Sequence, residues 1–359
     1  MLSESSSFHG WLASAPRANA GALAAETVLP LADAGWLAFD LEVKMFRVAV
    51  IQRPPIFLNK AETIGSAVSS VREAAATGAR LIVFPEAFIP GYPAWIWRLR
   101  PGADMDLSER LHARLLAESV RIEAGDLEPL CDAAREHDVT VVCGLDERDP
   151  ELSRTTLYNS VVVIGANGAI LNVHRKLMPT NAERMVWGFG DATGLRVVDT
   201  PCGRVGALIC WENYMPLARC ALYAQGVDIY IAPTYDTGPR WLATMQHIAR
   251  EGGCWVIGSG CAFQGQHIPH AVPGKAELYP DTSAWINSGD SVIVAPGGNV
   301  VAGPLRDELG VLYAELDLER VGFARRSLDI VGHYSRPDIF RLHVNNDRLS
   351  PVEFSGVRK

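Results

Sequence analysis

The stretch FRVAVIQRPPIFLNKAETIGSAVSSVREAAATGARLIVFPE, residues 46–86, alternates between two hydrophobic periods. Its two ends, FRVAVIQ and RLIVFPE, are short apolar runs typical of buried strands, and the second run stops at Pro85. Between them, apolar residues recur at helical spacing on one face: Ile64, Val68, Val71 and Ala75. A strand, a helix and a second strand in this order predict an α/β protein.

The same alternation continues along the chain. Further strands are predicted at VTVVCGL, RVGALIC, DIYIAP and CWVIGSG, and helices at 108–137, 216–226 and 241–252. Two stretches, 157–176 and 290–304, each contain an apolar strand, an Asn/Gly turn and a return strand, which predicts two β-hairpins. Their likeness suggests two similar halves, each a mixed sheet with helices on its outer face.

The composition is that of an ordinary globular protein, with 48% hydrophobic and 21% charged residues in a chain of 359. A formal net charge of −8 argues against a nucleic-acid partner and against an acidic membrane surface. No apolar run approaches the ~18 residues of a transmembrane helix. We expect a main domain over 45–335 and a C-terminal tail over 336–359. Residues 1–44 lack the basic start and apolar core of a signal peptide, so a flexible extension is expected there.

The seven cysteines are an odd number and include no CxxC pair. This usage predicts reduced thiols in a cytoplasmic protein, and the spacing does not match a structural zinc site. The sequence also lacks the standard dinucleotide-, phosphate- and zinc-binding motifs. His267 and His270 form an HxxH pair with no third ligand nearby, so two exposed histidines are expected there rather than a metal site.

Three chemically capable side chains stand at the ends of predicted strands: Glu86, Lys176 and Cys210. Each has a structural alternative, because thiols are common in cores, a glutamate can cap a helix, and a basic run usually faces solvent. Together they suggest a site in which a carboxylate takes the proton of a thiol. A nearby lysine would lower the pKa of that thiol and stabilise the charge that develops on a substrate. No histidine stands at a matching strand end to pair with the cysteine.

The segments around these residues resemble the nitrilase superfamily. Glu86 in FPEAFIPGYP, Lys176 in HRKLMPT and Cys210 in LICWENYMP match the Glu-Lys-Cys triad of that family. The resemblance runs from about Met45 to GHYSRPDIFRL near residue 332, and includes RMVWGFGD and ATMQHIAREG. CWEN and HYSRPD look like the nitrilase branch.

The resemblance implies an αββα sandwich with mixed β-sheets, whose subunits pair into a four-layer αββα–αββα unit. The partners it implies are a small nitrile and a second copy of the chain, in a homodimer or a larger spiral oligomer. The implied reaction converts an organic nitrile to a carboxylic acid and ammonia through a cysteine thioimidate and a thioester, with some amide as by-product. No cofactor is implied. An amidase, a cyanide-hydrolysing enzyme and a non-enzymatic module of the same superfamily are the alternatives.

The same resemblance assigns roles to residues. Glu86 would be the general base, Lys176 the electrostatic stabiliser and Cys210 the nucleophile. Glu183, seven positions after Lys176, matches a second glutamate that positions the site; its alternative is a surface carboxylate paired with the neighbouring arginine.

Tyr92 and Trp211 match positions that flank the substrate pocket of the family. The loops expected to build the pocket lie around these two residues, around Tyr235 and in the segment 264–285.

Overall fold

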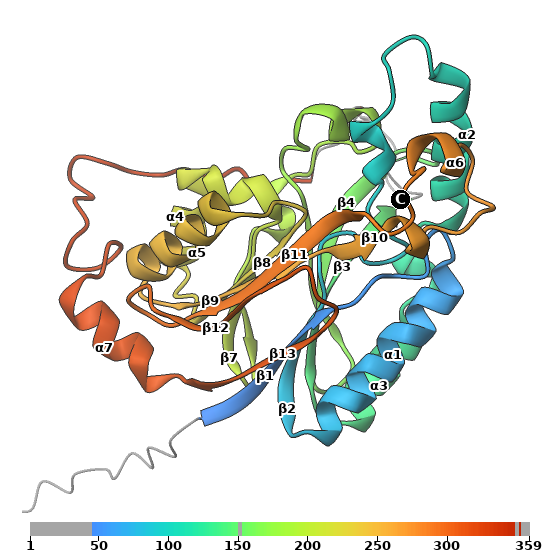
Figure 1. Cartoon of the computed structure of the whole chain (residues 1–359). Helices are drawn as coiled ribbons and strands as arrows, with labels where there is room; N and C mark the ends of the chain where they lie inside the picture. The colour runs from blue at the N-terminus through green and yellow to red at the C-terminus, as the bar shows by residue number, and fades with distance from the viewer. Residues whose placement is uncertain (1–44, 150–152, 349–351, 353–359) are drawn as a thin grey trace, which may run out of the picture. The chain divides into compact units, whose positions relative to one another are not determined.

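Two mixed β-sheets lie face to face at the centre of the computed structural model, which describes residues 45–149, 153–348 and 352 (Figure 1). The first sheet has the strand order β13-β1-β2-β3-β4-β5. Its strands are β1 (Met45–Gln52), β2 (Ala79–Val83), β3 (Thr140–Arg148), β4 (Leu157–Ile164), β5 (Ile170–Arg175) and β13 (Gly310–Asp317). β1, β2 and β3 are parallel to one another, whereas the other pairings are antiparallel.

The second sheet repeats this plan. Its order is β10-β11-β9-β8-β7-β6, with β12 paired to β11, and β7, β8 and β9 are parallel. Its strands are β6 (Val198–Thr200), β7 (Gly203–Ala207), β8 (Ile229–Thr234), β9 (Trp255–Gly260), β10 (Ala262–Gln264), β11 (Trp285–Val294) and β12 (Val300–Arg306). The prediction of two similar mixed sheets is therefore confirmed.

Helices cover the outer face of each sheet (Figure 1). α1 (Lys60–Ala76) and α3 (Glu128–Glu136) pack on the first sheet, and α4 (Pro216–Ala224) and α5 (Pro239–Gly252) pack on the second. The inner faces of both sheets meet in a shared apolar core: Val50, Val83, Val142, Val205, Ile231 and Ile257. Because each sheet is buried on both faces, its central strands are continuously apolar, and the layers follow the predicted αββα order.

The single helix predicted over 108–137 is wrong. The chain forms α2 (Met105–Glu118), a short 3-10 turn at Ile122–Ala124, and then α3. Val120 interrupts the helix because its main chain bonds β3, donating to the carbonyl of Asp146 at 2.8 Å and accepting from the amide of Arg148 at 2.8 Å. A residue that pairs with a strand cannot also continue a helix.

Both predicted hairpins are present. β4 and β5 pair around the turn at Ala166-Asn167-Gly168, where Gly168 has a φ of +80°, and β11 pairs with β12. The segment 264–285 contains a 3-10 turn and α6 (Lys275–Leu278), and the remaining helix, α7 (Glu319–Ser327), follows β13. Apolar residues of 264–285 are buried against the loop after β2, so this segment is more than a surface loop: Ile268, Val272, Leu278 and Tyr279.

Two further expectations concern the ends of the chain and the thiols. The extension predicted over 1–44 lies outside the described residues. Among the described residues, no helix has the length and apolar character needed to cross a membrane. All seven cysteines are free. His270 is exposed, as expected, but His267 is half-buried and its Nδ1 accepts a hydrogen bond of 2.9 Å from the main chain of Gln264.

Candidate active site

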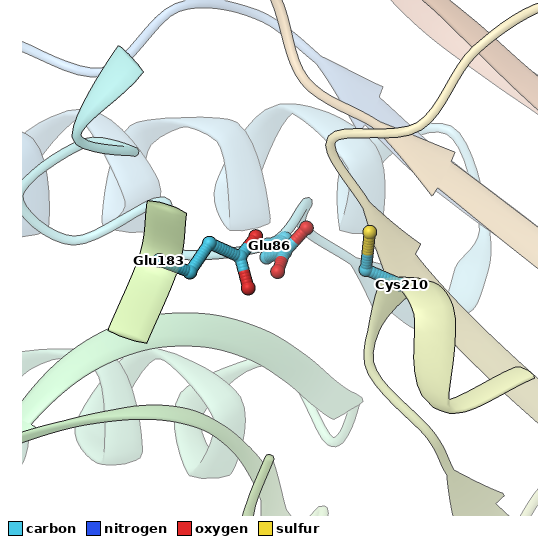
Figure 2. Close-up of side chains that lie close together, drawn as sticks. All are labelled: Glu86, Glu183 and Cys210. Atoms are coloured by element: carbon cyan, nitrogen blue, oxygen red, sulfur yellow. The ribbon is translucent and has the colours of Figure 1, made fainter. Parts of the chain in front are cut away.

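The side chains singled out in the sequence converge from separate strand ends. Glu86 follows β2, Lys176 follows β5, and Cys210 follows β7. In open α/β sheets, the segments beyond the carboxyl ends of the strands build the binding crevice. Figure 2 shows Glu86, Glu183 and Cys210 approaching one another, and one carboxylate oxygen of each glutamate and the thiol sulfur lie within 4.8 Å of one another.

Glu86 is 1% exposed and its carboxylate accepts hydrogen bonds on both oxygens. Oε1 accepts from Lys176 Nζ at 2.8 Å and from Asn159 Nδ2 at 2.7 Å, and Oε2 accepts from the amide of Tyr235 at 2.6 Å. The turn carrying Glu86 rests on Gly144, because a Cβ at that position would lie 2.3 Å from the carbonyl oxygen of Pro85. Any side chain at position 144 would therefore displace the carboxylate.

Burial raises the pKa of Glu86 to about 7, an effect that Lys176 opposes and the negative charge of Glu183 reinforces. A carboxyl group with a pKa near neutrality can both accept and donate a proton under physiological conditions. Burial also lowers the pKa of Lys176, but the negative charges around it, led by Glu86, outweigh this, and its pKa is raised overall. The ammonium therefore stays charged.

Glu183 lies on the 3-10 turn Asn181–Met185 and is buried. Its Oε2 accepts from Lys176 Nζ at 2.7 Å and from the amide of Thr180 at 2.7 Å, while Oε1 accepts from the hydroxyl of Tyr92 at 2.7 Å. The alternative of a surface carboxylate paired with Arg184 is therefore wrong, since Arg184 instead donates to the carbonyl of Pro179. Lys176 is held between two carboxylates.

Cys210 opens the 3-10 helix Cys210–Tyr214 in a left-handed conformation, with a φ of +52°. This conformation is costly for a residue with a side chain and clusters at functional sites. Lys176 lowers the pKa of the thiol, as expected, but this effect does not prevail. Burial and the negative charge of Glu86 raise the pKa overall, and Lys176 and a hydrogen bond with Thr234 oppose them only in part. The resting residue is a thiol.

A third buried carboxylate, Glu212, joins the segments that carry Lys176 and Cys210. Its Oε1 accepts from the amide of Leu177 at 2.7 Å, and its Oε2 accepts from the amide of Ile209 at 2.6 Å. His174 Nε2 lies 3.1 Å from both oxygens. This role of Glu212 was not predicted from the sequence, although a glutamate two residues after a cysteine that ends an apolar run is a visible signal.

Asn159 was also missed, although an asparagine in the apolar run LYNSVVVIG is unusual enough to mark it. Its side-chain amino group donates to Glu86, and its main-chain carbonyl accepts from the amide of Lys176 at 2.8 Å. One residue of β4 therefore orients the carboxylate and holds the main chain of the lysine.

A cavity of about 450 Å³ opens above Cys210. It is lined by side chains from several loops: Tyr92, Trp97, Thr180, Asn181, Glu183, Trp211, Tyr235, Asp236, Thr237, Trp285, Ile286, Asn287 and Ser288. Tyr92, Trp211 and Tyr235 were expected there. Of the segment 264–285, Trp285 reaches the cavity, and the remainder packs behind it.

The aromatic wall of the cavity is held by specific contacts. Tyr92 and Tyr235 stack with ring centroids 3.8 Å apart and an interplanar angle of 8°. Trp211 is 46% exposed, and its indole nitrogen donates to Asp236 Oδ2 at 2.9 Å. Glu86 and Lys176 are buried next to the cavity and do not line it, so a bound molecule would meet Cys210 and Glu183 first.

Glu86, Glu183 and Cys210 are the group of potential metal ligands found within the described ranges. The ammonium of Lys176 already bonds both carboxylates. A second cation would meet this positive charge at close range, so the arrangement does not suit a metal ion.

The chain belongs to the carbon–nitrogen hydrolase family, whose model matches residues 47–326. An aliphatic nitrilase from Sinorhizobium fredii is 41% identical over 308 residues, which are 86% of this chain and 98% of the relative. A bifunctional nitrilase/nitrile hydratase, NIT4B, from Nicotiana tabacum is 39% identical and covers 87% and 89% of the two chains. These likenesses assign the chain to the nitrilase branch of the family.

Solved structures share the fold. A carbon–nitrogen hydrolase from Helicobacter pylori G27 has a TM-score of 0.63 at 21% identity, covering 83% of this chain and 97% of the other. Saccharomyces cerevisiae Nit3, a member of branch 10 of the nitrilase superfamily, has a TM-score of 0.61 at 19% identity, covering 81% and 96%. At such identities the likeness supports the αββα architecture.

Proposed function

We propose that this nitrilase hydrolyses an organic nitrile to a carboxylic acid and ammonia, with Cys210 as nucleophile and Glu86 as general base. Lys176 stabilises the developing negative charge, and Glu183 positions Lys176. The observation that carries the proposal is the clamped ammonium: Lys176 donates to Glu86 at 2.8 Å and to Glu183 at 2.7 Å, beside a thiol at the floor of a cavity.

In the first step, Glu86 takes the proton of Cys210 as the sulfur forms a bond to the nitrile carbon. The transfer accompanies the attack, because burial keeps the resting residue protonated. Negative charge then grows on the nitrile nitrogen. An ammonium has three N–H bonds, and two of those on Lys176 point to carboxylates, which leaves one for this nitrogen. The proton held by Glu86 passes to the nitrogen and gives a neutral thioimidate.

In the second step, Glu86 removes a proton from water as its oxygen adds to the thioimidate carbon. Transfer of that proton to nitrogen gives a tetrahedral intermediate with a hydroxyl and an amino group. Glu86 then moves the hydroxyl proton to the amino group as the C=O bond forms, so ammonia leaves and a thioester of Cys210 remains. A second water, activated in the same way, then releases the carboxylic acid and restores the thiol. If the C–S bond breaks before the C–N bond, the product is an amide. Relatives from tobacco and lupin are named bifunctional nitrilase/nitrile hydratases, and we propose that this chain also releases some amide.

Ammonia release from a panel of nitriles tests the reaction. The panel contains phenylacetonitrile, mandelonitrile, benzonitrile, fumaronitrile and cyanide, with phenylacetamide as the amide control. Activity on at least one organic nitrile is expected, and it should disappear in Cys210→Ala. Cys220→Ala is the matched control, because Cys220 is a free thiol on α4 outside the cavity, and it should retain activity.

The same panel separates the alternatives. Turnover of phenylacetamide without turnover of any nitrile would identify an amidase, and turnover of cyanide alone would identify a cyanide-hydrolysing enzyme. Activity that survives Cys210→Ala would contradict the assignment of the nucleophile.

We also propose that the chain acts as a cytoplasmic homodimer or larger spiral oligomer, with its domain over 45–335, an extension over 1–44 and a tail over 336–359. Exposed apolar side chains on the segment from the 3-10 helix after Cys210 into α4 support self-association: Trp211, Tyr214, Met215 and Leu217. Light scattering coupled to gel filtration measures the assembly, and a monomeric mass for the full chain would contradict it. Nucleic acid and membranes are not expected partners.

A further inference from the structure

Two buried oxygen atoms beneath Glu86 have no hydrogen-bond donor. Among the described residues, Asp146 Oδ2 and Asn159 Oδ1 are both inaccessible to solvent and without a partner. Asp146 on β3 and Asn159 on β4 are directly opposite each other in the antiparallel register. Their side chains share the inner face of the sheet with Val142 and Val161, and directly opposed residues have Cβ atoms about 4.5–5.5 Å apart.

The other polar atom of each side chain has a partner, and these partners identify the unpaired atoms of Asp146 and Asn159 as acceptors. Glu86 Oε1 also accepts from Lys176, so the group of Asn159 that faces this carboxylate must be the amino group, and its oxygen points elsewhere. Asp146 Oδ1 accepts from Trp187 Nε1 at 2.7 Å, and an indole nitrogen is only a donor. Two acceptors are therefore left on neighbouring side chains, and a buried polar atom without a partner is costly.

We propose that Asp146 is kept as a neutral carboxylic acid whose Oδ2 hydroxyl donates a hydrogen bond to Asn159 Oδ1. One proton satisfies both atoms. The chain of contacts then runs from Trp187 through Asp146 and Asn159 to Glu86, and it fixes the asparagine amide in the orientation that holds the carboxylate. Asp146 is a positioning residue, and its role rests on the function proposed for Glu86.

The surroundings favour the neutral form. Burial raises the pKa of Asp146 well above its usual range, the Trp187 hydrogen bond opposes this, and the negative charge of Glu86 adds to the rise. When Glu86 is deprotonated, a second negative charge on Asp146 is disfavoured. A neutral acid in an apolar site can donate a hydrogen bond at physiological pH in a way that a carboxylate cannot.

Infrared spectroscopy and two substitutions test the inference. At about pH 8, well above the ordinary aspartate pKa of ~4, the wild-type minus Asp146→Asn difference spectrum should contain a protonated carboxyl C=O band. Asp146→Asn keeps a donor, because its amino group can face Asn159 while its oxygen accepts from Trp187, and its kcat should stay within about threefold of wild type. Asp146→Ala lacks the donor. Its kcat should fall about tenfold or more with KM nearly unchanged, and the acid limb of its pH profile should move to higher pH.

The absence of the infrared band, or an Asp146→Asn variant as impaired as Asp146→Ala, would overturn the proposal. The spectrum is recorded without substrate and does not depend on catalysis or on the folding of Asp146→Ala. Loss of the role proposed for Glu86 would be seen separately, as a Glu86→Gln variant that remains active while the Asp146 band persists.

Discussion

Two buried glutamates of the site, Glu86 and Glu212, use their carboxylates differently. Glu86 bonds two side chains, Lys176 and Asn159, and one main-chain amide, and it lies within 4.8 Å of the Cys210 thiol. Glu212 bonds the main-chain amides next to Lys176 and Cys210, together with the ring of His174. Glu86 can exchange protons with its neighbours, whereas Glu212 joins two main-chain segments. The difference shows that burying a charge serves reactivity in one place and geometry in the other.

The largest effect is expected from Lys176→Met, which removes the cation that neutralises two buried carboxylates. Breaking a buried ion pair on one side costs about 3–5 kcal/mol, and loss of an electrostatic stabiliser costs about 10²–10³-fold in kcat. Urea unfolding and ammonia release measure both. Lys60→Met is the control. Lys60 forms an ion pair of 2.6 Å with Asp126, is partly exposed, and does not line the cavity. It should retain full activity, and equal losses in the two variants would contradict a special role for Lys176.

Glu212→Gln should have the next largest effect. The amide has one acceptor oxygen in place of two, so the amide of either Leu177 or Ile209 faces a donor and loses its partner. We expect the free energy of unfolding to fall by about 1–3 kcal/mol and kcat to fall about 10–100-fold. The acid limb of the pH profile should stay in place, because the contacts of Glu86 are unchanged. A shifted limb would show that Glu212 acts on the proton-transfer group itself.

The pH dependence of kcat/KM sharpens the role of Glu86. Its pKa is raised to about 7, and a base must be deprotonated, so activity should fall as the pH drops below about 7 and level off above it. The hydrogen bond from Asn159 lowers this pKa, so Asn159→Ala should move the limb to higher pH and reduce activity at neutral pH severalfold. Asn172→Ala is the control, because Asn172 lies on β5 and donates to the carbonyl of Gly194 rather than to Glu86. If the acid limb does not move in Asn159→Ala, the group that titrates in the limb is not Glu86 held by Asn159.

The smallest effect on the chemistry is expected from Trp211→Ala. The substitution removes a cavity wall and the bond to Asp236, but no contact of Glu86 or Glu212. KM should change about 3–30-fold, while kcat changes less and the stability stays within about 1 kcal/mol, because Trp211 is half-exposed. Trp97→Ala, which removes a wall residue bonded to Tyr92, provides the comparison. A kcat loss as large as that of Glu212→Gln would mean that the wall also positions the nucleophile.

The architecture could be predicted because hydrophobic period is a local property. Apolar runs at helical or strand spacing identified both sheets, both hairpins and the outer helices. The helix over 108–137 was wrong because its break at Val120 arises from a bond to β3, a contact that local periodicity does not contain.

The site was predictable to the extent that chemistry stood out at strand ends. Glu86, Lys176 and Cys210 each interrupt an apolar run, and the structure brings them together. The sequence did not predict the roles of Glu212, Asn159 and Asp146, because each role depends on a partner far along the chain. These partners are, in the same order, His174, Glu86 and Trp187. The net rise in the pKa of Cys210 was not predicted, for a related reason. Sequence shows that a cation is near, but the burial that outweighs it exists only in the folded protein.

Part of the cavity wall is separate from the buried charges, and this has an evolutionary consequence. Tyr235 donates to Glu86 through its main-chain amide, and within the described part of the chain Trp211, Trp285 and Ile286 line the cavity without a hydrogen bond to Glu86 or Lys176. Mutations can therefore reshape the space around a substrate while the reactive centre is inherited unchanged. A lineage built on this fold can diversify what it accepts through single substitutions, each exposed to selection without an inactive intermediate.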